Sequence, residues 1–248
     1  MDHGSRQGTC LLTDEGDSAA KALEVTPSSY ARWRSSFLGE VTERLEQHAI
    51  LEAAGDLRGR SVLDAGCGDG AFAVAAWAKG ARVSGVDASQ AMLEAPHTRA
   101  LGSGARVDLV HASVEELPFP AGTFDVVVMA SVLCTVQNPL RAVSEAARVL
   151  RPGGRLVLGE LHVWSLWSLS RRLRGWLGNP FWRGVRFWTV GEIRAMVHHV
   201  GLNVQHVRGC IYYPPWETAA RLLWRADQPL SHLGTFGAAF LIVRAGKE

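Results

Sequence analysis

The stretch VLDAGCGDG (residues 62–70) carries the strongest structural signal in this chain. A short apolar run leads into Asp64 and then into three glycines separated by single residues, and the helix-like sequence AFAVAAWAKG follows. This order predicts a strand, a tight turn and the start of a helix. Glycines tolerate positive φ angles and let a ligand approach the bare backbone, while the helix behind them presents free N–H groups. The stretch therefore indicates a binding site for a small polar group.

Length and composition predict one globular protein with a full core. The chain has 248 residues, of which 47% are hydrophobic, and its formal net charge is only +2. That charge gives no reason to expect a nucleic-acid partner. Four cysteines lack the spacing of a zinc site or a disulfide framework, so we expect no metal and a reducing, cytoplasmic location. Residues 1–24 are expected to be disordered and residues 25–248 to form a single domain.

The rest of the chain alternates strand-like and helix-like segments. This alternation predicts right-handed crossovers and an α/β fold, with a doubly wound, mostly parallel sheet covered by helices on both faces. A long helix at 30–54 is expected before the first strand, and the chain ends on a strand, so the sheet should have seven. The later strands are expected at 82–87, 106–111, 124–130, 154–161, 203–213 and 235–245, and the other helices at 71–79, 89–101, 138–150, 189–200 and 217–224.

An acid at the end of the second expected strand points to the same crevice as the glycines. Asp87 follows Gly66 by 21 residues, about where a doubly wound nucleotide site places a carboxylate for ribose hydroxyls. A dinucleotide site would favour GxGxxG, whereas this chain has GxGxG. On spacing alone, an NAD-dependent oxidoreductase stays open as an alternative.

Four segments taken together resemble the class I S-adenosylmethionine-dependent methyltransferases, and in particular their small-molecule, type 11-like domain. VLDAGCGDG, GVDASQAML, ELPFPAGTFDVVV and RVLRPGGRLVLGE occur in that family's order and spacing across residues 60–160. The resemblance implies a Rossmann-like, seven-stranded sheet with a reversed last strand. It also implies S-adenosylmethionine as the methyl donor and S-adenosylhomocysteine as the product.

The resemblance assigns cofactor contacts position by position. The three glycines would approach the methionyl part of the cofactor, Asp64 would support their loop, and Asp87 would take the ribose hydroxyls. Ser113 stands where the family often has an acid that accepts a hydrogen bond from the adenine amino group. The full expected cofactor set is Asp64, Gly66, Cys67, Gly68, Gly70, Asp87, Ala88, Met92, Ser113, Val114 and Ser131.

Candidate catalytic residues follow the fourth and fifth strands, because ligands sit at the carboxyl ends of strands in open α/β sheets. His162 is a candidate general base, with a histidine hydrogen-bonded at a strand end as the alternative. Glu160 is a candidate to orient it or to bind the acceptor, with a solvated acid as the alternative. Cys134 is a candidate pocket residue, with a small buried hydrophobe as the alternative. A sulfonium is already activated, so a strong base is optional.

The expected acceptor cover comes from the segment before the first strand and from an insertion at 162–188. That insertion is rich in tryptophan and arginine, and an aromatic lid favours an apolar or flat acceptor. The expected substrate-binding residues are Tyr30, Trp33, Arg34, Trp164 and Tyr212. Plain packing of extra helices on the sheet is the alternative.

Several functional alternatives remain at this point. The leading one is methylation of a small organic acceptor at O, N or S. A methyltransferase-like module that acts through a partner is a second, although Asp64, Asp87 and the glycines are all present. The basic, aromatic insertion has the composition of a helix that lies on an anionic membrane, which would suit a lipid or quinone acceptor, but a solvated lid face is favoured. Nothing in the sequence distinguishes a monomer from a dimer.

Overall fold

The computed structural model describes residues 32–248. Within this range, the side chains of residues 95–98, 101 and 233 are not described. The expectations for residues 1–24 and for Tyr30 therefore lie outside the described residues. Among the described residues, no helix is both long enough and apolar enough to cross a membrane.

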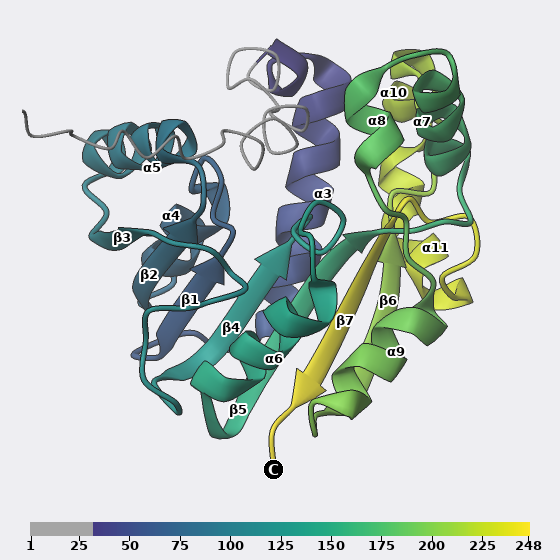
Figure 1. Ribbon diagram of the computed structural model, residues 1–248. Helices are drawn as coiled ribbons and strands as arrows, with labels where there is room; N and C mark the ends of the chain where they lie inside the picture. The colour runs from purple at the N-terminus through teal and green to yellow at the C-terminus, as the bar shows by residue number, and fades with distance from the viewer. Residues whose placement is uncertain (1–31) are drawn as a thin grey trace, which may run out of the picture.

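Seven strands form one sheet in the order β3-β2-β1-β4-β5-β7-β6 (Figure 1). All neighbouring pairs are parallel except those of β7, which runs antiparallel to both β5 and β6. The sheet confirms the doubly wound, mostly parallel fold with a reversed last strand. The strands are β1 (Ser61–Ala65), β2 (Arg82–Asp87), β3 (Val107–His111), β4 (Phe124–Ala130), β5 (Leu150–Leu161), β6 (Asn203–Cys210) and β7 (Phe240–Gly246).

Helices cover both faces of the sheet and form two apolar cores. One core packs α3 and α4 against valines of β1, β2 and β4, and the other packs α6 and α9 against the opposite side of the same strands. The α-helices are α3 (Phe37–Ala54), α4 (Ala71–Ala78), α5 (Gln90–Ser103), α6 (Pro139–Val149), α7 (Leu166–Trp176), α8 (Pro180–Gly184), α9 (Val190–His199), α10 (Glu217–Leu223) and α11 (Asp227–Leu230).

The expected long helix at 30–54 is wrong at its start. The helix α3 begins at Phe37, because the Ser36 hydroxyl accepts a hydrogen bond from the Gly39 N–H at 3.1 Å and caps the helix there. The expected helix cap at Thr189 is confirmed, with reciprocal bonds between Thr189 and Glu192 at the start of α9.

Three strand boundaries also differ from the expectation. Strand β5 starts at Leu150, which pairs with Phe124 across a register shift, so the PGG sequence lies inside the strand. Strand β6 ends at Cys210, since Ile211 has a φ of 65°. Strand β7 begins only at Phe240, after a segment in which Gly237 has a φ of 84°.

The insertion after β5 forms α7 and α8 and returns to the sheet. The Arg186 N–H donates to the Cys134 carbonyl at 3.0 Å, and the Trp188 N–H donates to the Leu161 carbonyl at 2.8 Å. These bonds hold the insertion beside the loop that follows β4. Figure 1 shows α7, α8 and α10 gathered at the end of the sheet where the parallel strands finish, next to the first turns of α3.

Candidate functional site

The glycine loop joins β1 to α4 at the carboxyl edge of the sheet. Gly66, Gly68 and Gly70 have φ angles of 81°, 52° and 73°, which residues with a side chain rarely adopt. A Cβ on Gly66 would lie 2.4 Å from Val132 Cγ2, whereas a Cβ on Gly68 would touch only Met92 Cε among the described residues, at 3.6 Å. Gly66 is therefore required by packing against the loop after β4, and Gly68 leaves its surface open.

The Asp87 carboxylate lies against this loop. One oxygen accepts a hydrogen bond from the Gly68 N–H at 2.9 Å, and the other accepts from the Ser89 N–H at 2.9 Å. Asp87 is only half-buried, so the carboxylate also remains within reach of a ligand at the loop. The structure thus brings the second-strand acid and the glycine loop into direct contact, as their spacing predicted.

Asp64 lies beneath the same loop and is almost completely buried, with 3% of its surface exposed. Burial, together with the negative charge of Asp87, raises its pKa to about 7. Its Oδ2 atom has no hydrogen-bond partner among the described residues. A buried carboxylate in this state is stabilised by a cation placed at the loop.

The residues expected beside an adenine ring gather after β2 and β3. Met92 reaches toward Gly68, and the Ala88 carbonyl accepts a hydrogen bond from His111 Nε2 at 2.8 Å. Val114 is buried, whereas Ser113 is exposed and its hydroxyl oxygen accepts from the Glu115 N–H at 3.1 Å. The Ser113 hydroxyl is therefore engaged within its own turn.

Glu160 shapes the loop that follows β4 instead of facing solvent. It is fully buried, and its Oε1 atom accepts hydrogen bonds from the N–H groups of Val132 and Leu133 at 3.1 and 2.7 Å. Burial raises its pKa to about 8. In the same loop, Ser131 has a φ of 57°, and its carbonyl accepts from the Cys134 thiol. The solvated-acid alternative for Glu160 does not fit these surroundings.

His162 is buried at the end of β5, with 2% of its surface exposed. Its Nδ1 atom donates to the Ala238 carbonyl at 3.1 Å, and burial lowers its pKa. This geometry matches the alternative of a histidine hydrogen-bonded at a strand end. Cys134 is also buried, and burial raises the pKa of its thiol, which suits a small buried hydrophobe. The catalytic roles of both residues stay predictions.

The described cover residues have different surroundings. Arg34 forms ion pairs with Glu43 and with Asp69 of the glycine loop, so it ties the segment before α3 to that loop. Trp33 is half-buried, and Trp164 is 60% exposed. The Tyr212 hydroxyl donates to the Gly234 carbonyl, and burial raises its pKa to about 12. Their substrate roles stay predictions.

A stacked arrangement on the insertion was not expected from the sequence. The Arg171 guanidinium lies 4.9 Å from the ring centroid of Trp167 and 4.9 Å from that of Trp182. The Trp167 indole N–H donates to the Tyr213 carbonyl at 2.8 Å, which anchors α7 to the segment after β6. Trp167 and Gly175 are buried, and Arg171 lies midway between them, so α7 presents Arg171 toward the protein.

Glu46 of α3 faces this stack and was also missed. It lies one helical turn after Thr42, and the buried residues Ala49 and Ile50 follow it on the same side of the helix. Burial raises its pKa to about 7, although the positive charges of Arg171 and Arg34 oppose that shift. Neither Glu46 nor Arg171 has a side-chain hydrogen bond or ion pair with another residue in the described range. The Arg171 charge is thus near enough to Glu46 to lower its pKa, and no side-chain hydrogen bond to a described residue occupies either polar group.

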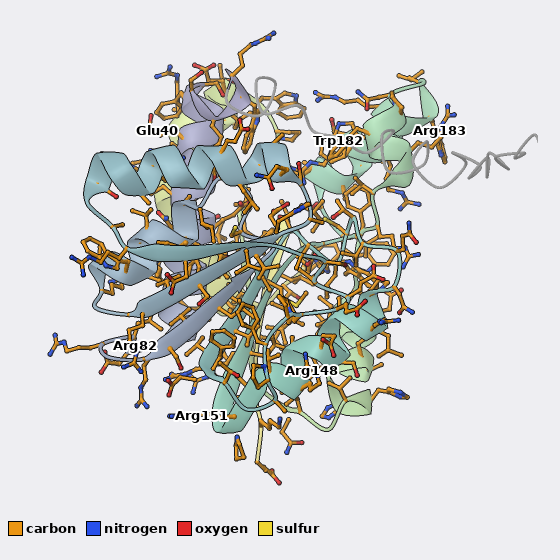
Figure 2. All side chains as sticks on the ribbon, turned by 60° about the vertical axis from the view of Figure 1, so that its left-hand side comes forward. Glu40, Arg82, Arg148, Arg151, Trp182 and Arg183 are labelled. Carbon is orange, nitrogen blue, oxygen red and sulfur yellow. The ribbon has the colours of Figure 1, made fainter. Side chains whose placement is uncertain are left out.

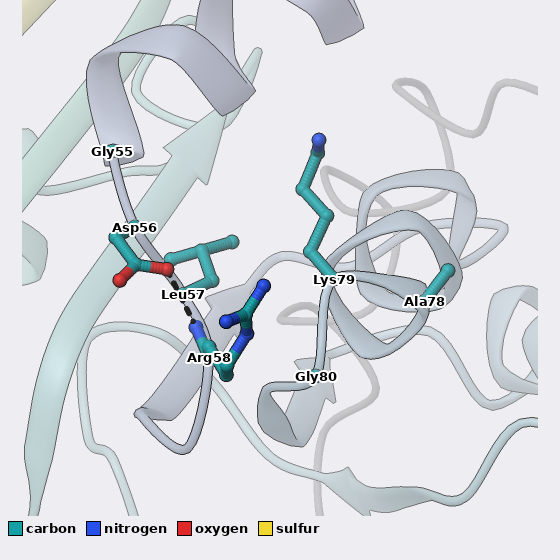
Figure 3. Close-up of a pocket in the computed structure, with 7 residues that line it drawn as sticks. All are labelled: Gly55, Asp56, Leu57, Arg58, Ala78, Lys79 and Gly80. Carbon is teal, nitrogen blue, oxygen red and sulfur yellow. Dashed lines mark hydrogen bonds between the residues drawn. The ribbon is translucent and has the colours of Figure 1, made fainter.

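A hollow at the other end of the sheet is a different feature (Figure 3). It lies between the loop after α3 and the last turn of α4, where β1 and β2 begin. Its lining is Gly55, Asp56, Leu57, Arg58, Ala78, Lys79 and Gly80. Because ligands in open α/β sheets bind at the carboxyl ends of the strands, this hollow is separate from the candidate site.

Comparisons with known proteins agree with this geometry. The chain matches the family model of a methyltransferase domain over residues 63–158, which runs from the first strand to the fifth. It is 30% identical over 178 residues to the ubiquinone biosynthesis O-methyltransferase of Xanthomonas euvesicatoria, and the match covers 69% of this chain and 74% of that enzyme. The chain therefore belongs to the class I S-adenosylmethionine-dependent methyltransferases, and it is an enzyme of that class.

Two further similarities bear on the fold and on the reaction. The chain is 36% identical over 150 residues to the demethylmenaquinone methyltransferase of Clavibacter sepedonicus, and this match spans 60% of each protein, less than two thirds of that enzyme. A solved S-adenosylmethionine-dependent methyltransferase of Thermotoga maritima superposes with a TM-score of 0.67 over 92% of this chain and 99% of that one, at 23% identity. The latter likeness shows the fold alone.

Proposed function

We propose that this methyltransferase transfers the methyl group of S-adenosylmethionine to an oxygen of a planar, hydroxylated aromatic acceptor. The observation that carries the proposal is the Trp167–Arg171–Trp182 stack facing Glu46 at the carboxyl end of the sheet. The names of the two relatives support a quinone-type aromatic acceptor, since one is a demethylmenaquinone methyltransferase and the other an O-methyltransferase of ubiquinone biosynthesis. Only the second name supports oxygen as the methylated atom.

The residues of the glycine loop fit the cofactor. Asp87 would hold the ribose hydroxyls, Met92 would pack on the adenine, and the open surface of Gly68 would admit the methionyl part. The unpaired Oδ2 of Asp64 lies where a cationic ammonium group would stabilise its charge. When bound, S-adenosylmethionine supplies a methyl group already activated on a sulfonium.

On the acceptor side, the chain has to bind, orient and deprotonate a hydroxyl. The Arg171 guanidinium lies near two indole rings, and its N–H groups would donate to an acceptor oxygen. Glu46 accepts the proton of the hydroxyl, because a carboxyl with a pKa of about 7 is both partly ionised and basic enough at neutral pH. Trp167 and Trp182 give the flat ring an apolar contact and exclude water.

The test is a panel of water-soluble acceptors assayed by release of S-adenosylhomocysteine. Catechols and hydroquinones with short side chains should be methylated in preference to aliphatic amines and thiols. Glu46→Gln should lower kcat by about 100-fold and remove the acid limb of the pH profile, as expected for loss of a general base. Arg171→Met should raise KM by roughly tenfold, the effect of losing a hydrogen bond to a charged group.

Matched controls separate acceptor recognition from folding and cofactor binding. Arg172→Met changes the neighbouring residue, which is exposed on α7, and should leave kcat and KM unchanged. Calorimetry should show the same S-adenosylmethionine affinity in all three variants. Methylation confined to amines or thiols, or unchanged kinetics in both Glu46→Gln and Arg171→Met, would contradict the proposal.

A further inference from the structure

The outward side of α7 carries an apolar stripe that the acceptor site does not use. Five large hydrophobic side chains lie there, at successive spacings of three, four, three and one residues. They are on the side of the helix opposite the buried Trp167 and Gly175. The stripe consists of Leu166, Leu169, Leu173, Trp176 and Leu177, which are 54%, 54%, 46%, 81% and 87% exposed. Surface leucines and tryptophans gathered in one patch mark an interaction site.

Positive charge borders this stripe on both sides. At the angular spacing of an α-helix, Arg172 and Arg174 fall on its two opposite edges, and both are exposed. Exposed Arg183 of α8 lies beside Trp182 at the same end of the molecule, far from Arg148 and Arg151 (Figure 2). The insertion at 162–188 holds five arginines and no acidic residue, although the whole chain has a net charge of only +2. The patch is therefore both apolar and strongly basic.

We propose that the outward side of α7 docks on an anionic lipid bilayer, with the apolar stripe in the headgroup boundary and the flanking arginines on lipid phosphates. A helix with one apolar side, arginines along its edges and no membrane-spanning length lies in the membrane surface. Arginine stems lie along apolar surface and extend their charged ends to the phosphates.

Charge favours a bilayer over a second copy of this chain. A symmetric dimer would bring the same patch of each copy together, which would place Arg172 and Arg174 close to their own counterparts. Like charges in such an interface repel, and no acidic residue of the insertion is present to offset them. An anionic bilayer supplies the opposite charge directly.

The docked orientation connects the membrane to the active site. One side of α7 presents Arg171 and Trp167 toward the protein, and the other side would rest on the bilayer. An apolar acceptor dissolved in the bilayer would then pass into the active site beside α7, the helix that would also bind its polar ring. This use of the docking surface rests on the proposed function, whereas the docking itself does not.

The test is flotation of the purified full chain with vesicles of phosphatidylcholine mixed with phosphatidylglycerol, compared with phosphatidylcholine alone. The chain should float with the anionic vesicles only, and added salt should weaken binding. The double variant Arg172→Glu/Arg174→Glu should bind anionic vesicles more weakly than wild type. Each lost arginine should reduce the partition coefficient by at least about fivefold, which is the contribution of one basic residue near an anionic surface. Leu169→Ser, Leu173→Ser and Leu177→Ser together should reduce it by roughly tenfold or more.

The controls keep this proposal separate from the proposed function. Arg58→Glu with Arg82→Glu makes the same charge change on exposed residues near the opposite end of the sheet and should leave partitioning less affected. All variants should still methylate a water-soluble acceptor as wild type does. Failure of wild type to bind anionic vesicles, equal binding by the α7 variants, or a leucine-dependent dimer without vesicle binding would overturn the docking proposal. Loss of methyl transfer with intact vesicle binding would count against the proposed function alone.

Discussion

The two halves of the active-site end are built in different ways. On the cofactor side, the glycines, Asp87 and Met92 come from one short segment and act largely through backbone conformation. On the proposed acceptor side, Glu46 and Arg171 come from helices far apart in the chain and would act through side-chain charge. We therefore expect cofactor binding to be sensitive to any added atom, and acceptor binding to be sensitive to changes in charge.

The largest effect is expected for Gly68→Ala. The new methyl group would clash with no described residue, since its nearest described neighbour, Met92 Cε, is 3.6 Å away, but it would occupy the open surface of the loop. We expect S-adenosylmethionine affinity, measured by calorimetry, to fall by roughly a hundredfold because the backbone can no longer be approached closely. Backbone strain alone costs about 1–2 kcal/mol of stability.

Gly59→Ala is the matched control for that strain. Gly59 has a similar positive φ of 69°, and a Cβ placed there would meet nothing within 4 Å. This variant should lose a similar amount of stability and keep full cofactor affinity. Equal affinity losses in the two variants would show that strain, not close approach, governs the cofactor side.

A smaller effect is expected from comparing Asp87→Ala with His162→Ala. Asp87→Ala should weaken S-adenosylmethionine binding by about 10-fold to 100-fold, the range for losing hydrogen bonds to a charged group. His162→Ala should leave affinity nearly unchanged and lower thermal stability, because it removes a buried hydrogen bond to the Ala238 carbonyl. If His162→Ala instead lowered kcat strongly without loss of stability, His162 rather than Glu46 would be the base.

The smallest effect concerns the dependence of stability on pH. Asp64, Glu46 and Glu160 have pKa values of about 7, 7 and 8 in the folded protein, all above their ordinary values. Between the ordinary pKa of each carboxyl and its raised pKa in the folded protein, the unfolded chain has released a proton that the folded chain still holds. The free energy of unfolding should therefore decrease as pH rises through this range.

Glu160→Gln isolates one of these contributions. The amide oxygen can still accept from the N–H groups of Val132 and Leu133, but the side chain no longer titrates. Urea unfolding at several pH values should show a shallower decline than in wild type. An unchanged slope would mean that Glu160 is already ionised in the folded protein.

Local patterns predicted most of the fold because each depends on neighbouring residues. The turn at Gly66 and Gly70, the capped start of α9 at Thr189 and the strands β2 and β4 all arise from backbone preferences and hydrophobic spacing within a few residues. The start of β5 at Leu150 was missed because pairing with Phe124 extends that strand beyond its own propensity.

The acceptor side could not be read in the same way. Helical spacing places Glu46 on the buried side of α3, and this spacing is the one signal in the sequence that could have identified it. The position of Arg171 near Glu46 depends on the packing of α7 and α8, which the sequence does not reveal. His162 and Glu160 drew attention by chemistry and position, yet both are buried and hydrogen-bonded to backbone.

The sheet, the glycine loop and the acid that lies against it could be predicted from the amino-acid sequence, because short-range backbone geometry specifies them. The packing of distant segments was needed to show that Arg171 lies near Glu46 and which side of α7 points outward. Those relations depend on contacts between segments distant in the chain, where burial shifts pKa values and packing selects one side of each helix.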